Sequence, residues 1–289
     1  MKSDAELPAS GMPKLHDLLQ TQAYGDLKAR AAETVRKQPA NARERWLLFQ
    51  LLCLDGAWAR ALKQLQTWAS LEPQGEAKAQ LHRGLIQSEM FRAEVFAGTR
   101  TPGSIDPHPA WVETLLQANA KLGEGKLAEA DALREAALNE APATRGESAQ
   151  MGAFEWLAES DSRLGPICEM AVAGGYRWIP FDEMKSLTLT PAATLTDLVW
   201  RPVTAILRNA TVLRGYLPTR YPGSEIGPMP IKLGRETTWT DVGNTGVIAL
   251  GQKTWSTDQG DFGLLEIGHC RFIREDEATP ATESGDAAA

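Results

Sequence analysis

The chain has 289 residues, a length that corresponds to about two domains. Hydrophobic residues make up 43% and charged residues 23%, an ordinary globular mixture that can bury a core. The net charge is −7, but the last fifteen residues hold five acidic residues and no basic one, so the remainder of the chain is nearly neutral. A nearly neutral chain argues against nucleic acid or an anionic membrane as the main partner.

The first predicted element is a short amphipathic helix over residues 14–22. Leu15, Leu18 and Leu19 fall at positions i, i+3 and i+4 and therefore share one face. Pro13 suits a helix start. Because so short a helix is marginal by itself, we expect residues 1–23 to form a segment that packs against its own domain or another protein.

A pattern of turn, helix and proline recurs in the next part of the chain. Each copy begins with a small-residue turn, continues as an Ala-containing amphipathic helix and ends at a proline; the copies span 25–39, 56–73 and 125–142. Further helices are predicted at 42–54, 75–98 and 111–122, with a Pro-rich loop at 99–109. This pattern is typical of tetratricopeptide (TPR)-like repeats, although the spacing is irregular. We predict a TPR-like domain over 24–145 with a concave surface for a peptide or helix; a plain helical bundle without a groove is the alternative.

After a polar stretch at 143–150, short strands separated by Gly- and Asp-rich turns replace the helices. The predicted strands are 167–172, 176–181, 187–189, 198–207, 212–217, 231–233, 237–239, 247–250 and 262–273, and 182–186 is predicted as one helical turn. We therefore predict an α+β fold with a compact, mostly antiparallel β-rich domain over 150–274. The acidic, Ala-rich tail, 275–289, has the composition of a disordered segment.

The predicted hairpin over 197–225 carries unusual residues at its strand ends. Trp200 and Arg201 open the first strand, while Arg220 and Tyr221 follow the second between prolines that restrict the backbone. An Arg stacked on an aromatic ring is held in place and can still bind a carboxylate in bidentate geometry. Two interpretations remain open here: a structural cation–π pair that fixes a loop, or a surface for a ligand or partner.

A second polar group lies in the turn after Trp156. Asp161 and Arg163 can pair with each other, with Arg201 or with Arg220. The chain shows no Ser-His-Asp order, no GxSxG elbow and no phosphate-binding loop. We therefore predict no catalytic residues and no cofactor, since carboxylate–Arg networks are more often architecture than chemistry.

The cysteines and histidines give no metal signal. Cys53, Cys168 and Cys270 are far apart in apolar contexts, without a CxxC pair, and the four histidines are scattered, so we expect buried thiols in a reducing compartment and no metal site. The N-terminus has no apolar signal region, and the longest apolar run, 46–54, is too short to cross a bilayer. We expect a cytoplasmic protein without membrane insertion.

The second half of the chain resembles the ImpE/TagJ family of type VI secretion accessory proteins. The matching segments occur in order over about a hundred residues. They are WL at 156–157, DSRLGP at 161–166, YRWIP at 176–180, DLVWRP at 197–202, PTRYPGS at 218–224, RETTW at 235–239 and GQK at 251–253. We call the distinctive side chains of these segments the motif cluster, and we predict that it has a structural or binding role. Its members are Trp156, Asp161, Arg163, Trp200, Arg201, Arg220 and Tyr221.

The resemblance implies a non-catalytic, cytoplasmic accessory protein of the contractile sheath. Its implied partners are a small sheath subunit, bound through a helix, and the ClpV-type AAA+ ATPase that recycles contracted sheath. The family offers an N-terminal helical segment to the ATPase, which on this chain corresponds to Leu15, Leu18 and Leu19. The surface for the sheath subunit does not map onto particular residues.

Two other functions compete with this adaptor hypothesis. The first is an enzyme or a domain for a small anionic ligand, using Asp161, Arg163, Arg201 and Arg220; it requires these side chains to converge in an open pocket. The second is a self-associating structural protein.

Overall fold

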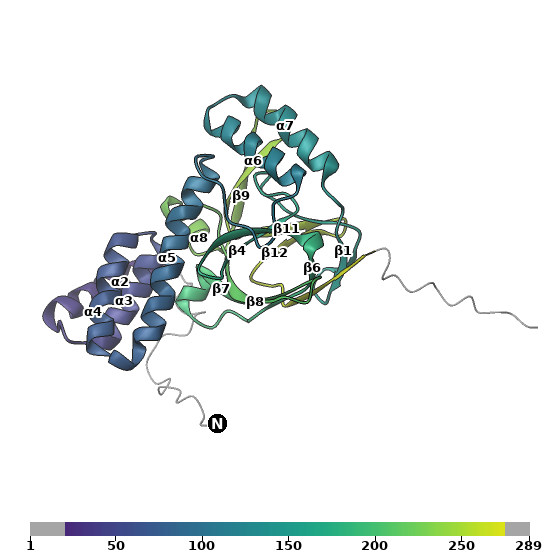
Figure 1. Cartoon of the computed structure of the whole chain (residues 1–289). Coiled ribbons are helices and arrows are strands. Elements are labelled where there is room, and N and C mark those ends of the chain that lie inside the picture. The colour runs from purple at the N-terminus through teal and green to yellow at the C-terminus, as the bar shows by residue number, and fades with distance from the viewer. Residues whose placement is uncertain (1–20, 275–289) are drawn as a thin grey trace, which may run out of the picture.

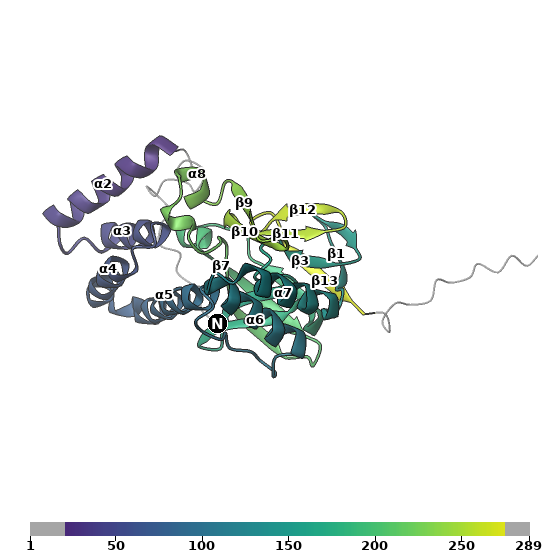
Figure 2. The same ribbon diagram turned by 90° about the horizontal axis from the view of Figure 1, so that it is seen from above.

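Residues 21–274 are described by the structure, a computed structural model, which begins with a layer of helices (Figure 1). The helices are α2 (Thr21–Lys37), α3 (Ala42–Leu54), α4 (Trp58–Leu71), α5 (Glu76–Phe96), α6 (Ala110–Gly123) and α7 (Leu127–Glu140), with a 3-10 turn, η1 (Pro73–Gly75), before α5. Helices α2 to α5 pack in sequence as one layer, and α6 and α7 form an antiparallel pair near the far end of α5 (Figure 2).

Within residues 21–274 the helix predictions hold except at one turn, and the helix predicted at 14–22 lies almost entirely outside the described residues. The predicted helices 42–54, 75–98 and 111–122 are confirmed as α3, α5 and α6. The predicted turn at Gly25 is wrong, because α2 is already helical at Thr21 and Gly25 lies inside it. A Cβ at Gly25 would meet open space, so neither a turn nor a close contact demands glycine there.

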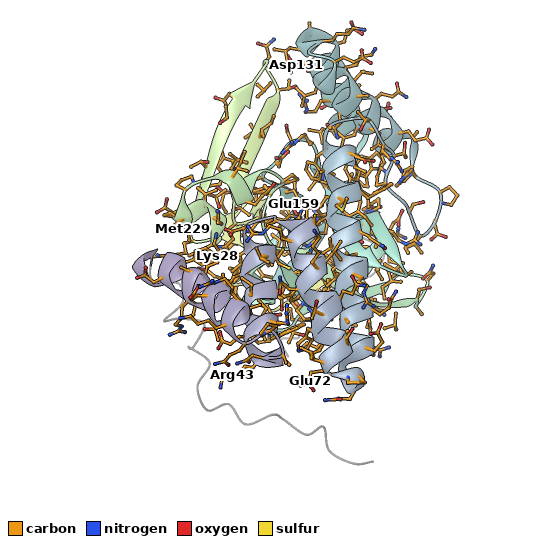
Figure 3. The ribbon with its side chains drawn as sticks, turned by 90° about the vertical axis from the view of Figure 1, so that its left-hand side faces the viewer. Lys28, Arg43, Glu72, Asp131, Glu159 and Met229 are labelled. Carbon is orange, nitrogen blue, oxygen red and sulfur yellow. The ribbon has the colours of Figure 1, made fainter. Side chains whose placement is uncertain are left out.

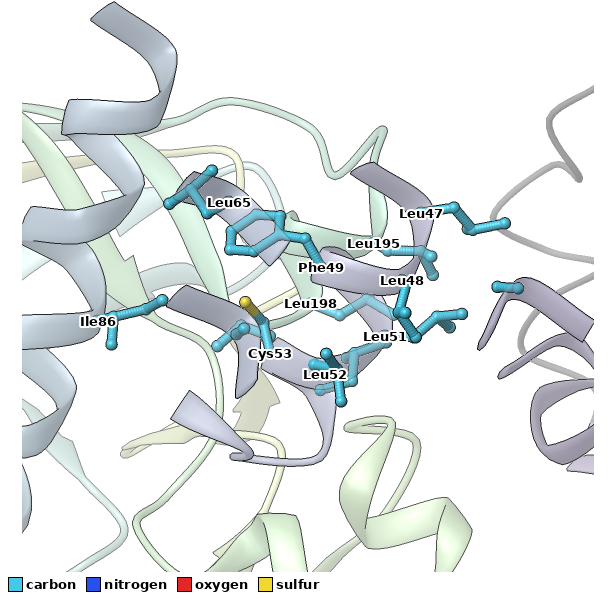
Figure 4. Packing of buried hydrophobic residues seen from close by; sticks show 14 of the residues in the cluster. Leu47, Leu48, Phe49, Leu51, Leu52, Cys53, Leu65, Ile86, Leu195 and Leu198 are labelled. Atoms are coloured by element: carbon cyan, nitrogen blue, oxygen red, sulfur yellow. The ribbon is translucent and has the colours of Figure 1, made fainter. Parts of the chain in front are cut away.

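Helix α3 is the centre of the helical layer. All residues from 47 to 54 are buried, because α2 and α4 cover two sides and the 3-10 turn η3 (Leu195–Leu198) covers a third. Figure 4 shows Leu195 and Leu198 beside the leucines of α3. A helix that is apolar all round has to be covered all round. The side of α3 facing η3 is therefore filled by the chain itself and leaves no room for a partner helix there.

The second half forms antiparallel sheets, and the predicted α+β fold is confirmed. The main sheet has the order β2-β1-β13-β6-β7-β8-β4-β5; β10 pairs with β9, and β12, β11 and β3 form a third sheet. The strands are β1 (Arg145–Ser148), β2 (Gly152–Phe154), β3 (Leu157–Glu159), β4 (Ile167–Val172), β5 (Gly175–Pro180), β6 (Met184–Leu189), β7 (Trp200–Leu207), β8 (Val212–Pro218), β9 (Thr237–Val242), β10 (Gly246–Gly251), β11 (Thr254–Thr257), β12 (Gly260–Gly263) and β13 (His269–Ile273).

The predicted hairpin over 197–225 is present, and the predicted strands 167–172 and 176–181 form a second hairpin. Strands β7 and β8 pair from Trp200↔Pro218 to Ile206↔Val212, with Ala210 at φ 65° in the turn. Strands β4 and β5 are joined through Ala173 and Gly174, whose φ values of 50° and 77° suit the tight turn of a twisted hairpin.

Four local predictions are wrong. The predicted strand 231–233 is instead part of helix α8 (Met229–Lys232), where Pro230 occupies the first turn and has no N–H for a ladder. The predicted helical turn 182–186 is a 3-10 turn, η2 (Phe181–Glu183), followed directly by β6. The predicted strand 262–273 is divided between β12 and β13, and the polar stretch 143–150 contains the short strand β1.

The hydrophobic cores join the two halves. The first cluster combines α2 to α5 with η3 and Trp200, whose ring centroid lies 5.8 Å from that of Trp58. Another cluster joins α5 and α6 to Trp178 of β5. Among residues 21–274, no helix combines the length and apolar character needed to cross a bilayer.

Candidate functional site

A buried charge network lies where α5 meets the sheets, with Glu169 of β4 at its centre. Glu169 accepts hydrogen bonds from Arg92 Nε and Nη2, both at 2.6 Å, and from the Tyr176 hydroxyl at 2.5 Å. Lys253 Nζ lies 2.8 Å from the same carboxylate. Burial by itself raises the pKa of Glu169, but Arg92 and Lys253 outweigh burial and lower this pKa to about 2.

Glu159, from β3, is the second carboxylate of this network, and Figure 3 places it between the helices and the sheet. Its side chain contacts Lys253 Nζ and accepts hydrogen bonds from Trp255 Nε1 at 3.0 Å and the Tyr221 hydroxyl at 3.3 Å. Burial raises the pKa of Glu159 to about 7, against the opposing effect of Lys253, and the nearby charge of Glu169 adds to the rise. Lys253 thus bridges two carboxyl groups that are both withdrawn from water.

The network continues along α5 to the start of the central hairpin. Arg92 Nη1 lies 3.3 Å from Glu89, and Glu89 accepts a 3.0 Å hydrogen bond from Trp200 Nε1. Arg92 Nη2 also donates to the carbonyl of Arg220 at 2.9 Å. The guanidinium of Arg92 has five N–H donors, so a single side chain can bind groups from several segments at once. The network therefore fastens α5 to β4, to β7 and to the segment after β8.

Asp161 and Arg163 form a separate buried ion pair. Arg163 donates from Nε at 2.8 Å and from Nη2 at 2.6 Å, and the backbone N–H of Ala249 donates to Asp161 at 3.0 Å. The Arg163 guanidinium lies 4.6 Å from the centroid of the Phe96 ring. The predicted mutual pairing is present, and it ties the 161–165 turn to β10 and α5.

Arg201 and Arg220 bind backbone carbonyl groups. Arg201 donates to the carbonyls of Thr190, at 2.7 Å, and Leu264; Arg220 donates to those of Leu54, at 3.0 Å, and Lys232. The predicted stacking on the neighbouring rings is wrong: neither guanidinium takes part in the cation–π contacts of residues 21–274. Successive side chains of an extended backbone point to opposite sides, so a guanidinium and its sequence neighbour face different surroundings.

The motif cluster is therefore divided among several places. Trp200 and Tyr221 belong to the charge network, Asp161 and Arg163 pair with each other, and Arg201 and Arg220 bind separate carbonyls. The open pocket of convergent side chains that the ligand or enzyme hypothesis required is not formed by Asp161, Arg163, Arg201 and Arg220. All four are buried.

Sequence reasoning singled out none of the charged side chains at the centre of the network, which are Glu89, Arg92, Glu159, Glu169 and Lys253. The available signals were a carboxylate inside the apolar strand ICEMAV and a lysine in the family segment GQK. Lys253 is 1% exposed and Glu169 is inaccessible. A network so enclosed and so fully paired holds structure together and cannot receive a substrate without opening.

Trp156 lies apart from this network, in an open pocket of about 600 Å³ on the surface. The pocket lies among β1, the loop before β3, η2 and the end of β13; its lining residues are Pro142, Ala143, Thr144, Arg145, Glu155, Trp156, Asp182, Arg208, Ile273 and Arg274. Trp156 is 41% exposed. Arg145 Nε pairs with Glu155 at 2.7 Å, and Arg208 Nε donates to the Asp182 carbonyl at 2.6 Å.

The remaining predicted positions bear on partners and metals. Leu15, Leu18 and Leu19 lie outside the described residues. Within residues 21–274 no group of three or more metal-binding side chains is arranged to hold an ion. Cys53, Cys168 and Cys270 are buried thiols, and burial raises the pKa of Cys168 and that of Cys270, the latter to about 12.

Comparisons with known proteins agree with this architecture. Residues 152–271 match the family model described as ImpE protein. The type VI secretion system accessory component TagJ of Pseudomonas aeruginosa is 40% identical over 228 residues, which cover 78% of this chain and 81% of TagJ. A crystal structure of a Vibrio parahaemolyticus protein shares the fold, with a TM-score of 0.81 and 23% identity over 90% of this chain and 98% of that one.

The fold and the site define an α+β protein whose helical layer is fastened to antiparallel sheets by buried ion pairs. The TagJ relative covers most of the chain, and the ImpE model covers the part that holds the motif cluster. The chain belongs to the ImpE/TagJ family.

Proposed function

We propose that this protein is an accessory adaptor of a type VI secretion system and acts by binding other proteins of that system. The observation that carries the proposal is its 40% identity, over 78% of the chain, to a protein named as an accessory component of such a system. The buried network supports it, because the polar residues of the family motif are engaged in holding the fold.

The adaptor has two partners in this proposal, both in the cytoplasm. One is a ClpV-type AAA+ ATPase, bound through Leu15, Leu18 and Leu19 of the N-terminal segment, 1–23. The other is a helix of the small sheath subunit, bound by the helical region, 24–145, with 150–274 as its scaffold. Since η3 covers one side of α3, the sheath helix is assigned to the outward surfaces of the layer.

The test of the first contact is a titration of the ATPase N-terminal domain with the full chain and with a peptide of residues 13–24. Three leucines on one face bury enough apolar surface for about 2–4 kcal/mol, so binding through this segment is weak and reversible. Leu18→Asp and Leu19→Asp should each weaken binding at least about tenfold, or about 1.4 kcal/mol.

The matched control is Gln20→Asp, which adds the same charge outside the leucine face. It should leave affinity within about twofold, or about 0.4 kcal/mol, and circular dichroism should be unchanged in all variants. Equal affinity of wild type and both leucine variants would show that the segment does not bind the ATPase.

A further inference from the structure

Strand β9 lies at the edge of its sheet beside β10, and no other strand of residues 21–274 pairs with it. The N–H of Gln252 donates to the carbonyl of Glu236 at 3.1 Å, in the register of the β9–β10 pairs. Because hydrogen-bonded pairs alternate along an antiparallel ladder, the even-numbered residues of β9 bind β10. The backbone groups of Thr237, Trp239 and Asp241 therefore point to the opposite side, which we call the outer edge of β9.

The outer edge of β9 differs from that of β10, which is filled by polar groups. The Ser162 hydroxyl accepts a hydrogen bond from the N–H of Val247 at 2.8 Å, and the Asp161 carboxylate accepts one from that of Ala249 at 3.0 Å. No hydrogen bond from another part of the described chain reaches the outer edge of β9. In Figure 1 the hairpin runs from beside α8 toward α7, so its two ends are held while this edge is open to a further strand.

The sequence of β9, TTWTDV, lacks the usual protection of a free edge. Proteins block such edges with Pro, Lys or a bulge, but residues 237–242 contain neither Pro nor Lys, and the register with β10 is uninterrupted. Residues 238–241 are all exposed, and Trp239 is 47% exposed. An extended peptide can therefore bind by backbone hydrogen bonds and also contact the indole of Trp239.

The charges of the hairpin indicate which peptide fits. From Glu236 to Gly251 the chain carries two acidic residues, Glu236 and Asp241, and no basic one. Both are exposed, and neither forms an ion pair with another described residue. A second copy of β9 would double the carboxylates along the shared edge, which is unfavourable. A basic segment pairs with them, and its Lys or Arg beside Asp241 also reaches the indole of Trp239, two residues away on the same face.

We propose that the outer edge of β9 is a docking site for an extended basic segment of another protein, which adds to the hairpin as a third strand. The backbone groups of Thr237, Trp239 and Asp241 form the ladder. A Lys or Arg of the segment lies between the carboxylate of Asp241 and the indole of Trp239. This partner binds as a strand, so the inference does not depend on the helix-binding contacts proposed above.

The experiment measures backbone amide exchange by NMR in the full chain, with and without a short peptide in which Lys alternates with Val and Thr. In the free chain the amides of Trp239 and Asp241 should exchange fast, whereas that of Thr240, which is bound to β10, should exchange slowly. Addition of the peptide to about 2 mM should slow exchange at Trp239 and Asp241 at least about threefold, because exchange falls with the unbound fraction. The same peptide with two adjacent central amides N-methylated keeps its charges, cannot complete the ladder and should lose this effect.

Asp241→Lys reverses the charge at the outer edge. This variant should lose the slowing at Trp239 with the basic peptide and gain it with a peptide that has Glu in place of Lys. Glu140→Lys is the matched control, because it makes the same charge change at the exposed far end of α7. It should respond to both peptides as the wild type does, and circular dichroism should be unchanged in both variants.

Exchange at Trp239 and Asp241 that is indifferent to the basic peptide would overturn the proposal, as would equal slowing by the acidic peptide. Protection of these amides in the free chain would overturn it as well. If that protection disappeared on dilution, the edge would belong to a second copy; if it persisted, the chain would cover the edge itself.

Discussion

Replacement of Lys253 by Met removes the cation that bridges the two buried carboxylates. Glu169 keeps Arg92, which donates two hydrogen bonds of 2.6 Å, so its charge remains paired. Glu159 keeps only the neutral donors Trp255 and Tyr221, at 3.0 and 3.3 Å. The variant therefore leaves one buried carboxylate without a cation.

Removal of one partner of a buried ion pair costs about 3–5 kcal/mol. We expect Lys253→Met to lower the free energy of unfolding by this amount at neutral pH. The loss should grow with pH, because Glu159 stays protonated in the folded variant while it is ionised in the unfolded chain. Between pH 7 and pH 8 the variant should lose about 1.4 kcal/mol, the equivalent of one pKa unit, whereas the wild type, in which the pKa of Glu159 is about 7, should lose only about 0.4 kcal/mol.

Urea unfolding followed by circular dichroism at pH 7 and pH 8 measures these losses. The double variant Lys253→Met/Glu159→Gln removes the stranded carboxylate as well and should recover at least half of the loss. A single variant within about 1 kcal/mol of the wild type, or a double variant no more stable than the single one, would refute the assignment of Lys253 as the neutralising cation.

Three further predictions follow from the same contacts. Glu159→Gln should flatten the pH dependence of stability. The pKa of Glu159 is raised from its ordinary value of 4.5 to about 7, so this group contributes stability that is present below pH 4.5 and is lost as pH rises through 7, by at most about 3 kcal/mol. Equal slopes of stability against pH for the variant and the wild type between pH 5 and pH 8 would contradict this. Asp161→Asn should cost about 2–4 kcal/mol in urea unfolding, because Arg163 loses its counter-charge; a cost below about 1 kcal/mol would show that the pair is dispensable. Asp131→Ala should increase hydrogen exchange at the tip of the β9–β10 hairpin. Asp131 of α7 (Figure 3) accepts hydrogen bonds there from the backbone N–H groups of Asn244, at 2.8 Å, and Thr245, at 3.1 Å. Unchanged exchange at this tip would show that other contacts hold the hairpin.

Local patterns predicted the elements of this fold well. Apolar periodicity located α3, α5 and α6, and the Gly-containing turn located the β4–β5 hairpin, because these signals depend on residues that are close in sequence. The errors arose where a local signal was ambiguous. Residues 231–233 are apolar enough for a strand, and the two prolines at 228 and 230 were the better guide to the helix α8.

The site was less predictable because its partners are distant in sequence. Arg92 and Glu169 are 77 residues apart, and nothing in their own segments indicates that they meet. Only the pairing of Asp161 with Arg163, two residues apart, could be predicted. For Arg201 and Arg220, the choice between an aromatic ring and a carbonyl group is decided by tertiary packing, which the adjacent residues do not reveal.

Affinity purification of the full chain from a native lysate of its own organism, with mass spectrometry of the bound proteins, tests the central claim most directly. The account predicts that the small sheath subunit and the AAA+ ATPase are both recovered with the wild type, and that Leu18→Asp loses the ATPase while keeping the sheath subunit. Recovery of neither protein with the wild type would contradict it.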